Sequence, residues 1–221
     1  MHIYWHFMFY GPVLEGVKLT LLLAVASQAA GIVLGIFAAL GRLSTLRIPI
    51  LRWIAFVYIW LFRGTPLLVQ LFFIYFAVPQ MTNGDILLDV LPSAFIALSL
   101  NEGAYMAEIV RAGIASVDAG QTEAAHSLGM TRMLAMRRIV LPQAIRIIIP
   151  PTGNEFISML KNTSLAYSIG ATELFYETQI ISQSGTGPGS QRFFELAAVA
   201  ATWYLIATTV FSFFQAIIER Y

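Results

Sequence analysis

Five polar side chains stand in segments of this sequence that are otherwise apolar: Gln70, Asn101, Glu102, Asn154 and Glu155. Polar and ionisable groups are costly at the depth of a bilayer, so they are candidates for a functional role where they occur. A carboxylate can hold an ammonium group, and an amide both donates and accepts hydrogen bonds. These residues are therefore suited to binding a polar, amine-bearing solute.

The composition predicts a protein embedded in a membrane. Of 221 residues, 58% are hydrophobic and only 11% are charged, whereas a soluble domain has about 25% charged residues. The apolar runs are continuous and do not alternate, which predicts an all-α, polytopic membrane protein. A net charge of +1 provides no large basic surface for nucleic acid. Because the chain has no cysteine, disulfides and thiolate metal sites are excluded.

We predict five membrane-spanning helices in a single domain, residues 1–221. The expected spans are 13–40, 53–78, 91–114, 141–169 and 193–218, and a polar loop covers about 115–140. Seven arginines fall around the first and third loops: Arg42, Arg47, Arg52, Arg111, Arg132, Arg137 and Arg138. The positive-inside rule puts these two loops in the cytoplasm. The N-terminus is then expected outside and the C-terminus inside.

The five polar residues are expected at similar depth. A rise of about 1.5 Å per helical residue puts Asn101 and Glu102 about 13–17 Å below the outer end of their span. The same rise puts Asn154 and Glu155 about 18–20 Å above the inner end of theirs, and Gln70 about 13 Å below its outer end. All five therefore lie near the midplane, where a transporter is expected to bind its substrate.

Two interpretations of these residues are open. Polar side chains within a bundle often hold helices together by hydrogen bonds, and for Gln70 we favour that structural role. For Glu155 we favour contact with the substrate, since intramembrane charges are functional by default. Asn101 and Glu102 are adjacent and point in different directions on one helix, so only one of them is expected to face a given neighbour.

Two spans contain helix-breaking residues. Arg63-Gly64-Thr65-Pro66 is expected to bend the second span, and Pro150-Pro151-Thr152-Gly153 is expected to break the fourth and free backbone groups for a substrate. Arg63 must extend to the interface or find a partner, and with Pro66 and Lys161 it is a candidate for gating or lining the pathway. Lys161 either extends to the interface or neutralises a pathway carboxylate. Glu108 and Arg111 have the i, i+3 spacing of a helical ion pair.

The polar loop has the sequence of a short capped helix. Asp118 is a good N-cap, and Gln121 follows at the spacing of a capping box. Gly129 suits the left-handed residue that ends a helix. Residues 132–139 would form a second amphipathic piece, and Pro142 suits the start of the next helix. An ordinary helical hairpin is the structural alternative to a docking role.

Motifs of other functions are absent or weak. His2 and His6 have i, i+4 spacing, but a zinc site needs three or four ligands. The sequence has no G-x-x-x-x-G-K-[ST] phosphate loop, which predicts that any ATP is hydrolysed by a partner. It also lacks H-E-x-x-H and G-x-S-x-G, which argues against an intramembrane protease or serine hydrolase.

The loop pattern E-A-A, three residues, Gly, nine residues, Ile-x-Leu-Pro, over 123–142, resembles the ATPase-docking loop of permeases of ATP-binding-cassette importers. The resemblance to polar amino-acid permeases covers nearly the whole chain. The residues that carry it lie in 63–67, 104–109, 111–114, 121–129, 141–144 and 153–156. Relatives bind an amino acid at positions that match Asn101 and Glu155, whereas many carry a small or neutral residue where this chain has Glu102.

The resemblance implies a type I importer permease with five spans and a cytoplasmic coupling helix in the inner membrane. Glu123, Ala124, Ala125 and Gly129 would couple it to the ATPase. The implied partners are two ATPase subunits, which bind ATP and magnesium, a second permease, identical or paralogous, and an external binding protein. No cofactor is expected on this chain. The expected function is inward transport of a polar amino acid by alternating access. An osmolyte or opine permease of the same superfamily, or a secondary transporter, are the alternatives.

Overall fold

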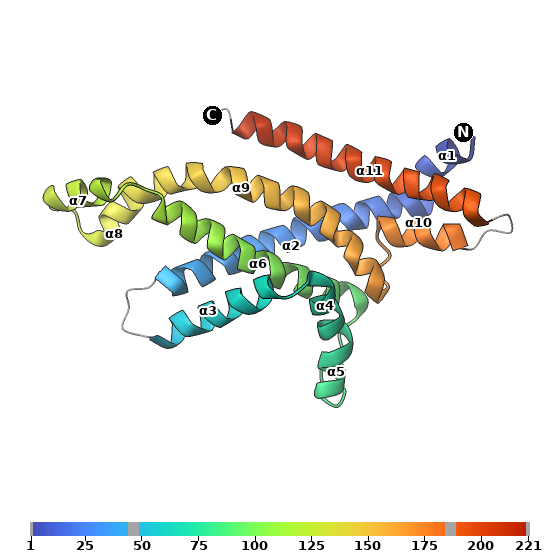
Figure 1. Cartoon of the computed structure of the whole chain (residues 1–221), viewed down its shortest axis with the longest axis horizontal. Helices are drawn as coiled ribbons and strands as arrows, with labels where there is room; N and C mark the ends of the chain where they lie inside the picture. Colours follow the sequence, from blue (N-terminus) through green and yellow to red (C-terminus); the bar gives the residue numbers. More distant parts are fainter. Residues whose placement is uncertain (1, 44–48, 184–188, 220–221) are drawn as a thin grey trace.

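The computed structural model describes residues 2–43, 49–183 and 189–219, and within these ranges it contains helices and no strand. Long helices run along one direction, with shorter helices at the two ends and to one side (Figure 1). The long helices are α2 (Gly11–Leu43), α3 (Pro49–Gly64), α6 (Val90–Ala115), α9 (Leu141–Asn162) and α11 (Gly189–Ile218). Helices α2, α6, α9 and α11 fall on predicted spans, whereas α3 covers only the first part of the span predicted over 53–78.

The shorter elements lie at three places. Helices α7 (Ala119–Ser127) and α8 (Arg132–Ala135) lie at one end, and α1 (His2–Met8) and α10 (Leu174–Gln183) lie toward the other (Figure 1). Helix α4 (Leu67–Phe72), the π-helical turn η1 (Phe73–Ala77) and α5 (Val78–Met81) project to one side (Figure 1). The remaining elements are η2 (Met136–Val140), which is π-helical, and η3 (Thr163–Ile169), which is 3-10 helical.

Length and composition mark some of these helices as membrane spans. Among the described residues, Gly11–Arg42 and Phe193–Ile218 are long and apolar enough to cross a membrane. The pair Ile50–Gly64 and Leu67–Met81 meets the same criterion jointly, with a bend of 110° between its parts. This bend confirms the break expected at Gly64–Pro66. Helices α6 and α9 carry the charged and polar residues described below, and the count of five spans stays a prediction.

Helices α2 and α6 pack most extensively because glycines let their backbones approach closely. Gly31 and Gly35 lie on one face of α2, at the small-xxx-small spacing that favours close helix contact in membranes. A Cβ at Gly35 would lie 2.5 Å from Met106 Cβ and 3.0 Å from Gly103 O. Helix α9 packs on this pair and on α11, so the α2–α6 pair is the centre of the fold.

Two prolines follow π-helical turns. Pro79 comes just after η1, and Pro142 comes just after η2. A proline leaves the carbonyl four residues earlier without its amide donor. A π-turn pairs carbonyls with the amide five residues on, as Val78 N does with Phe73 O, so the chain continues as a helix past the proline. Consequently α8, η2 and α9 are continuous, and Pro142 does not begin a separate helix as the sequence suggested.

The expected break at Pro150-Pro151 is wrong, because α9 runs unbroken from Leu141 to Asn162. Neighbouring side chains add hydrogen bonds to the backbone of this stretch. Thr152 Oγ1 donates to Ile148 O at 2.9 Å, and Gln215 Nε2 from α11 donates to Pro150 O at 3.1 Å.

Candidate functional site

The bend between α3 and α4 is closed by two of the predicted polar residues. Pro66 has no amide hydrogen, so Phe62 O lacks its helical donor. Gln70 Nε2 donates to Phe62 O at 2.8 Å and to Thr65 O at 3.0 Å. Asn101 Nδ2 donates to the same Phe62 O at 3.2 Å and to Gln70 Oε1 at 3.0 Å. Both side chains are buried. Gln70 therefore makes contacts of the structural kind expected for it, and Asn101 makes them as well.

Glu102 turns away from this bend toward α2. Its side chain is only 3% exposed, and its Oε1 accepts from Gln28 Nε2 at 2.8 Å. Gly31 makes room for it, since a Cβ there would lie 2.4 Å from Glu102 Cγ. Among the described residues, buried Gln28 Oε1 has no hydrogen-bond partner. The sequence analysis missed Gln28, although it lies in an apolar span and so carries the same signal as Gln70.

The five polar residues singled out in the sequence and Gln28 make up the polar layer of the helices. Glu155 lies in this layer on α9 and is half-buried. Glu155 lies within electrostatic range of both Glu102 and Arg63. Asn154 faces elsewhere: its Oδ1 accepts from Gln215 Nε2 at 3.2 Å, on the side of α11. The structure therefore brings Glu155 toward Glu102 and Arg63, and it does not bring Asn154 or Gln70 into this group.

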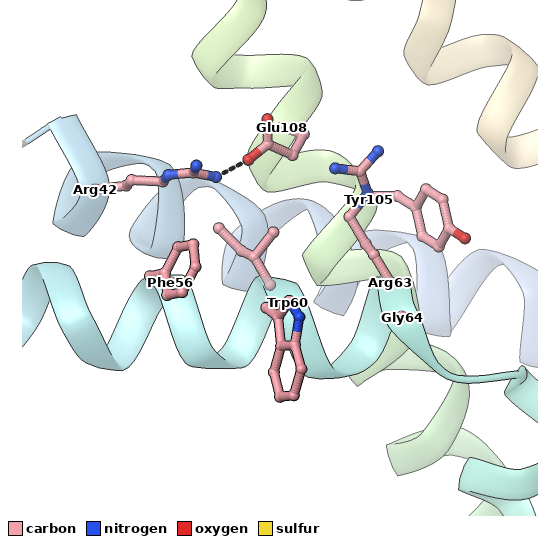
Figure 2. Close-up of a pocket in the computed structure, with 8 residues that line it drawn as sticks. Arg42, Phe56, Trp60, Arg63, Gly64, Tyr105 and Glu108 are labelled. Atoms are coloured by element: carbon pink, nitrogen blue, oxygen red, sulfur yellow. Dashed lines mark hydrogen bonds and ion pairs between the residues drawn. The ribbon is translucent and has the colours of Figure 1, made fainter.

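Arg63 ends α3 and lies over the ring of Tyr105, with Cζ 5.4 Å from the ring centroid. It lines a pocket of about 450 Å3 together with Arg42, Trp60 and Glu108 (Figure 2). Glu108 forms the expected ion pair with Arg111 at 2.8 Å and a second one with Arg42 from α2. Lys161 is exposed and forms no ion pair within the described ranges.

The polar loop has the local structure that its sequence indicated. Asp118 Oδ1 caps α7 by accepting from Gly120 N at 2.7 Å, and Gly129 has a φ of +80°. Glu123 and Ala124 are exposed, whereas Ala125 is buried against the chain itself. Of the four residues expected at an ATPase contact, Ala125 is thus the one that packs inward.

A second buried carboxylate was missed by the sequence analysis. Glu173 is fully buried and caps α10, accepting from Phe175 N at 2.9 Å and Tyr176 N at 2.8 Å. It also accepts from Tyr204 Oη at 2.7 Å and Thr20 Oγ1 at 3.4 Å. Burial raises the pKa of the Glu173 carboxyl, and these hydrogen bonds oppose that rise. The sequence could have indicated Glu173 as a helix cap, because it lies directly before the helix α10.

Metal chemistry has no candidate site in the part of the chain that the structure describes, where no three His, Asp or Glu side chains come together. The sequence also offered a weak metal site at His2 and His6. The side chain of His2 lies outside the described part of the structure. The arrangement instead offers separated positive and negative groups inside a membrane protein. Such an arrangement has the chemistry to bind and orient a polar solute.

Comparison with known proteins agrees with this arrangement. The chain is 41% identical over 218 residues to the probable amino-acid permease protein YxeN of Bacillus subtilis (strain 168), covering 98% of this chain and 94% of that protein. It is 43% identical over 213 residues to the L-cystine transport system permease protein TcyB of the same organism, covering 95% and 86%. A crystal structure of an amino acid ABC transporter with histidines matches with a TM-score of 0.86 and 39% identity, covering 95% and 93%.

A family model points the same way. The model for the binding-protein-dependent transport system inner membrane component matches residues 31–221, which is most of the chain. The matched region includes every residue of the polar layer except Gln28, and it includes the loop around Gly129. The chain therefore belongs to the family of inner membrane components of binding-protein-dependent transport systems.

Proposed function

We propose that this chain is the permease subunit of an ATP-binding-cassette importer and that it carries a polar amino acid inward by alternating access. The names of its relatives support amino-acid transport. The observation that carries the proposal is the grouping of Glu155, Glu102 and Arg63 inside the helices of a chain from this family. The chain is a transport subunit, and ATP is hydrolysed on a partner.

Glu155 is the proposed contact for the substrate ammonium. It is half-buried and makes no hydrogen bond in the described structure, so its carboxylate is free to accept one from a substrate. Glu102 is bound to Gln28 and lies close enough to Glu155 for the two groups to interact electrostatically. Gln70, Asn101 and Asn154 shape the layer around it by bonding to backbone and to other side chains. In this proposal their substrate role is indirect.

The proposed assembly contains two ATPase subunits, a second permease copy or paralogue and an external binding protein. ATP and magnesium are bound by the ATPase subunits, and we propose no cofactor on this chain. The arginines around the α7–α8 end support a cytoplasmic orientation of that end, with the N-terminus outside and the C-terminus inside. The exposed residues Glu123 and Ala124 and the turn at Gly129 are the proposed contact with the ATPase.

Uptake by the reconstituted complex tests the proposal, with labelled arginine, histidine, glutamine, cystine and the osmolyte glycine betaine as solutes. We expect uptake of one class of amino acid and none of the osmolyte. The change Glu155→Gln is expected to raise the substrate concentration for half-maximal uptake about tenfold or more, because a hydrogen bond to a charged group is worth about 1.5–3 kcal/mol. A preference for arginine or histidine would favour a direct carboxylate contact.

Glu177→Gln is the matched control, because Glu177 is a partly buried glutamate on α10, away from the polar layer. It should leave uptake unchanged. Unchanged uptake by Glu155→Gln would reassign Glu155 to packing. Uptake of glycine betaine alone would replace the amino-acid function with osmolyte import.

The turn at Gly129 provides a test of the coupling role. Gly129→Asp is expected to lower uptake at least tenfold while the chain still assembles in the membrane. The residue has positive φ, where an L side chain costs about 1–2 kcal/mol, and a Cβ there meets no other atom within 4 Å. The effect on folding is therefore small, and the added charge acts on whatever docks there. Uptake and ATP hydrolysis by the same proteoliposomes are the measurements.

Gly84→Asp is a closely matched control. Gly84 has a φ of +87° and, like Gly129, open space around its Cβ position, but it lies in the turn after α5. Both variants carry the same backbone strain, so only a docking role separates them. Equal uptake by the two variants would remove Gly129 from the coupling surface.

A further inference from the structure

The pocket between α3 and α6 carries more positive than negative charge. Glu108 is its only carboxylate among the lining residues, and both of its oxygens are already used. Oε1 accepts from Arg42 Nη1, and Oε2 accepts from Arg111 Nε at 2.9 Å and Nη2 at 2.8 Å. Arg63 forms no ion pair in the described part of the chain. The guanidinium groups of Arg42, Arg63 and Arg111 surround one carboxylate, so the net charge around the pocket is positive.

Arg63 reaches into this pocket from the polar layer. It directly follows Phe62, whose carbonyl is held by Gln70 and Asn101, so its backbone lies beside the bend. Its guanidinium extends over Tyr105, one helical turn beyond Asn101 on α6, and Glu108 lies between it and Arg42 (Figure 2). The side chain as a whole is exposed, as are Trp60 and Phe56 along the same face.

An exposed arginine at this depth has to face water or protein and not hydrocarbon. Charged side chains within membrane spans almost always face a bundle interior or a water-filled cavity. The pocket is therefore expected to open on the transport path or on a second permease subunit. Its lining residue Arg63 directly follows Phe62, whose carbonyl accepts from Gln70 and Asn101. The charge of Arg63 attracts Glu155, so positive and negative groups are available to one small solute.

We propose that Arg63 binds the α-carboxylate of the transported amino acid while Glu155 faces its ammonium group. This deepens the proposed function and rests on it. A guanidinium presents two parallel N–H donors that match the two oxygens of a carboxylate. Because Arg42 and Arg111 are held by Glu108, Arg63 is the guanidinium free to do so. The site therefore selects dipolar α-amino acids and rejects amines that lack the carboxylate.

Binding to the detergent-purified permease–ATPase complex, measured by saturation-transfer NMR without binding protein, tests this selectivity. The probes are arginine against agmatine and histidine against histamine, pairs that differ only in the carboxylate. The wild-type complex should bind the amino acid of the transported pair at least tenfold more tightly than its amine. Arg63→Gln should reduce that preference to about onefold, and Arg63→Lys should retain part of it.

Arg52→Gln is the matched control, because Arg52 is an exposed arginine on α3 that does not line the pocket. It should keep the wild-type preference. ATP hydrolysis stimulated by the binding protein is measured in every variant as the readout of assembly and docking. Loss of that stimulation together with loss of binding for both members of a pair would overturn the proposal in favour of a structural role.

The outcomes separate this inference from the proposed function. Absence of binding and uptake of every amino acid by the wild type overturns both. Amino-acid uptake by the wild type, with a carboxylate preference that survives Arg63→Gln, overturns the inference alone. The same measurements in nanodiscs of phosphatidylcholine with and without phosphatidylglycerol address an anionic lipid headgroup as the occupant. An effect of Arg63→Gln that is confined to phosphatidylglycerol nanodiscs would assign the pocket to lipid.

Discussion

Glu173→Ala is expected to destabilise the chain by at least about 3 kcal/mol. Two backbone amides and the hydroxyls of Tyr204 and Thr20 lose their acceptor in a fully buried place. A buried polar group left unsatisfied costs about 1–3 kcal/mol. The start of α10 and its contacts with α2 and α11 depend on this one carboxylate. Size-exclusion chromatography of detergent extracts after heating should show an apparent melting temperature lower by roughly 10 °C.

Glu177→Ala on the same helix is the control, because its carboxylate makes none of these hydrogen bonds and its loss should change the melting temperature little. The melting temperature of Glu173→Gln should lie between those of Glu173→Ala and Glu177→Ala. The amide oxygen of glutamine still accepts hydrogen bonds, whereas its amide nitrogen cannot. Equal melting temperatures for Glu173→Ala and Glu177→Ala would mean that the buried network does not hold α10 in place.

Gly35→Ala is expected to destabilise the contact between α2 and α6. The added Cβ would lie 2.5 Å from Met106 Cβ, 2.9 Å from Ala107 N and 3.0 Å from Gly103 O. Two of these atoms are backbone and cannot rotate away, so the helices must separate. Overpacking of this kind costs about 1–3 kcal/mol. The apparent melting temperature should fall by roughly 5 °C or more.

Gly41→Ala on the same helix should instead stabilise the chain and raise its apparent melting temperature. Its Cβ would lie 3.5 Å from Ala55 Cβ, an ordinary contact, and alanine is favoured over glycine in a helix by roughly 0.5–1 kcal/mol. A melting temperature that rises in both variants would show that α2 and α6 do not depend on close backbone approach at Gly35.

The features that could be predicted from the sequence depend on local chemistry. The bend at Gly64–Pro66 follows from a missing amide and a missing Cβ. The cap at Asp118 and the left-handed turn at Gly129 likewise follow from a residue and its immediate neighbours. The same is true of the Glu108–Arg111 pair, which is one helical turn apart. In each case the partner atoms lie within a few positions along the chain.

The features that could not be predicted depend on distant partners. Pro150 and Pro151 do not break α9, and Gln215, more than sixty positions later, bonds to the Pro150 carbonyl. Glu102 and Asn101 are neighbours in the sequence, yet one bonds to α2 and the other to the α3–α4 bend. Hydropathy and helical rise place Asn101 and Glu102 at a similar depth but do not say which helix each one faces.

The continuity of α8, η2 and α9 has a mechanical consequence. From Arg132 to Asn162 the chain is one helical rod, about 45 Å long at a rise of about 1.5 Å per residue. One end of this rod follows the turn at Gly129, and Glu155 lies near the other. Because no loop interrupts it, a push or a rotation applied at the α7–α8 end is delivered to the Glu155 carboxylate as the movement of a lever.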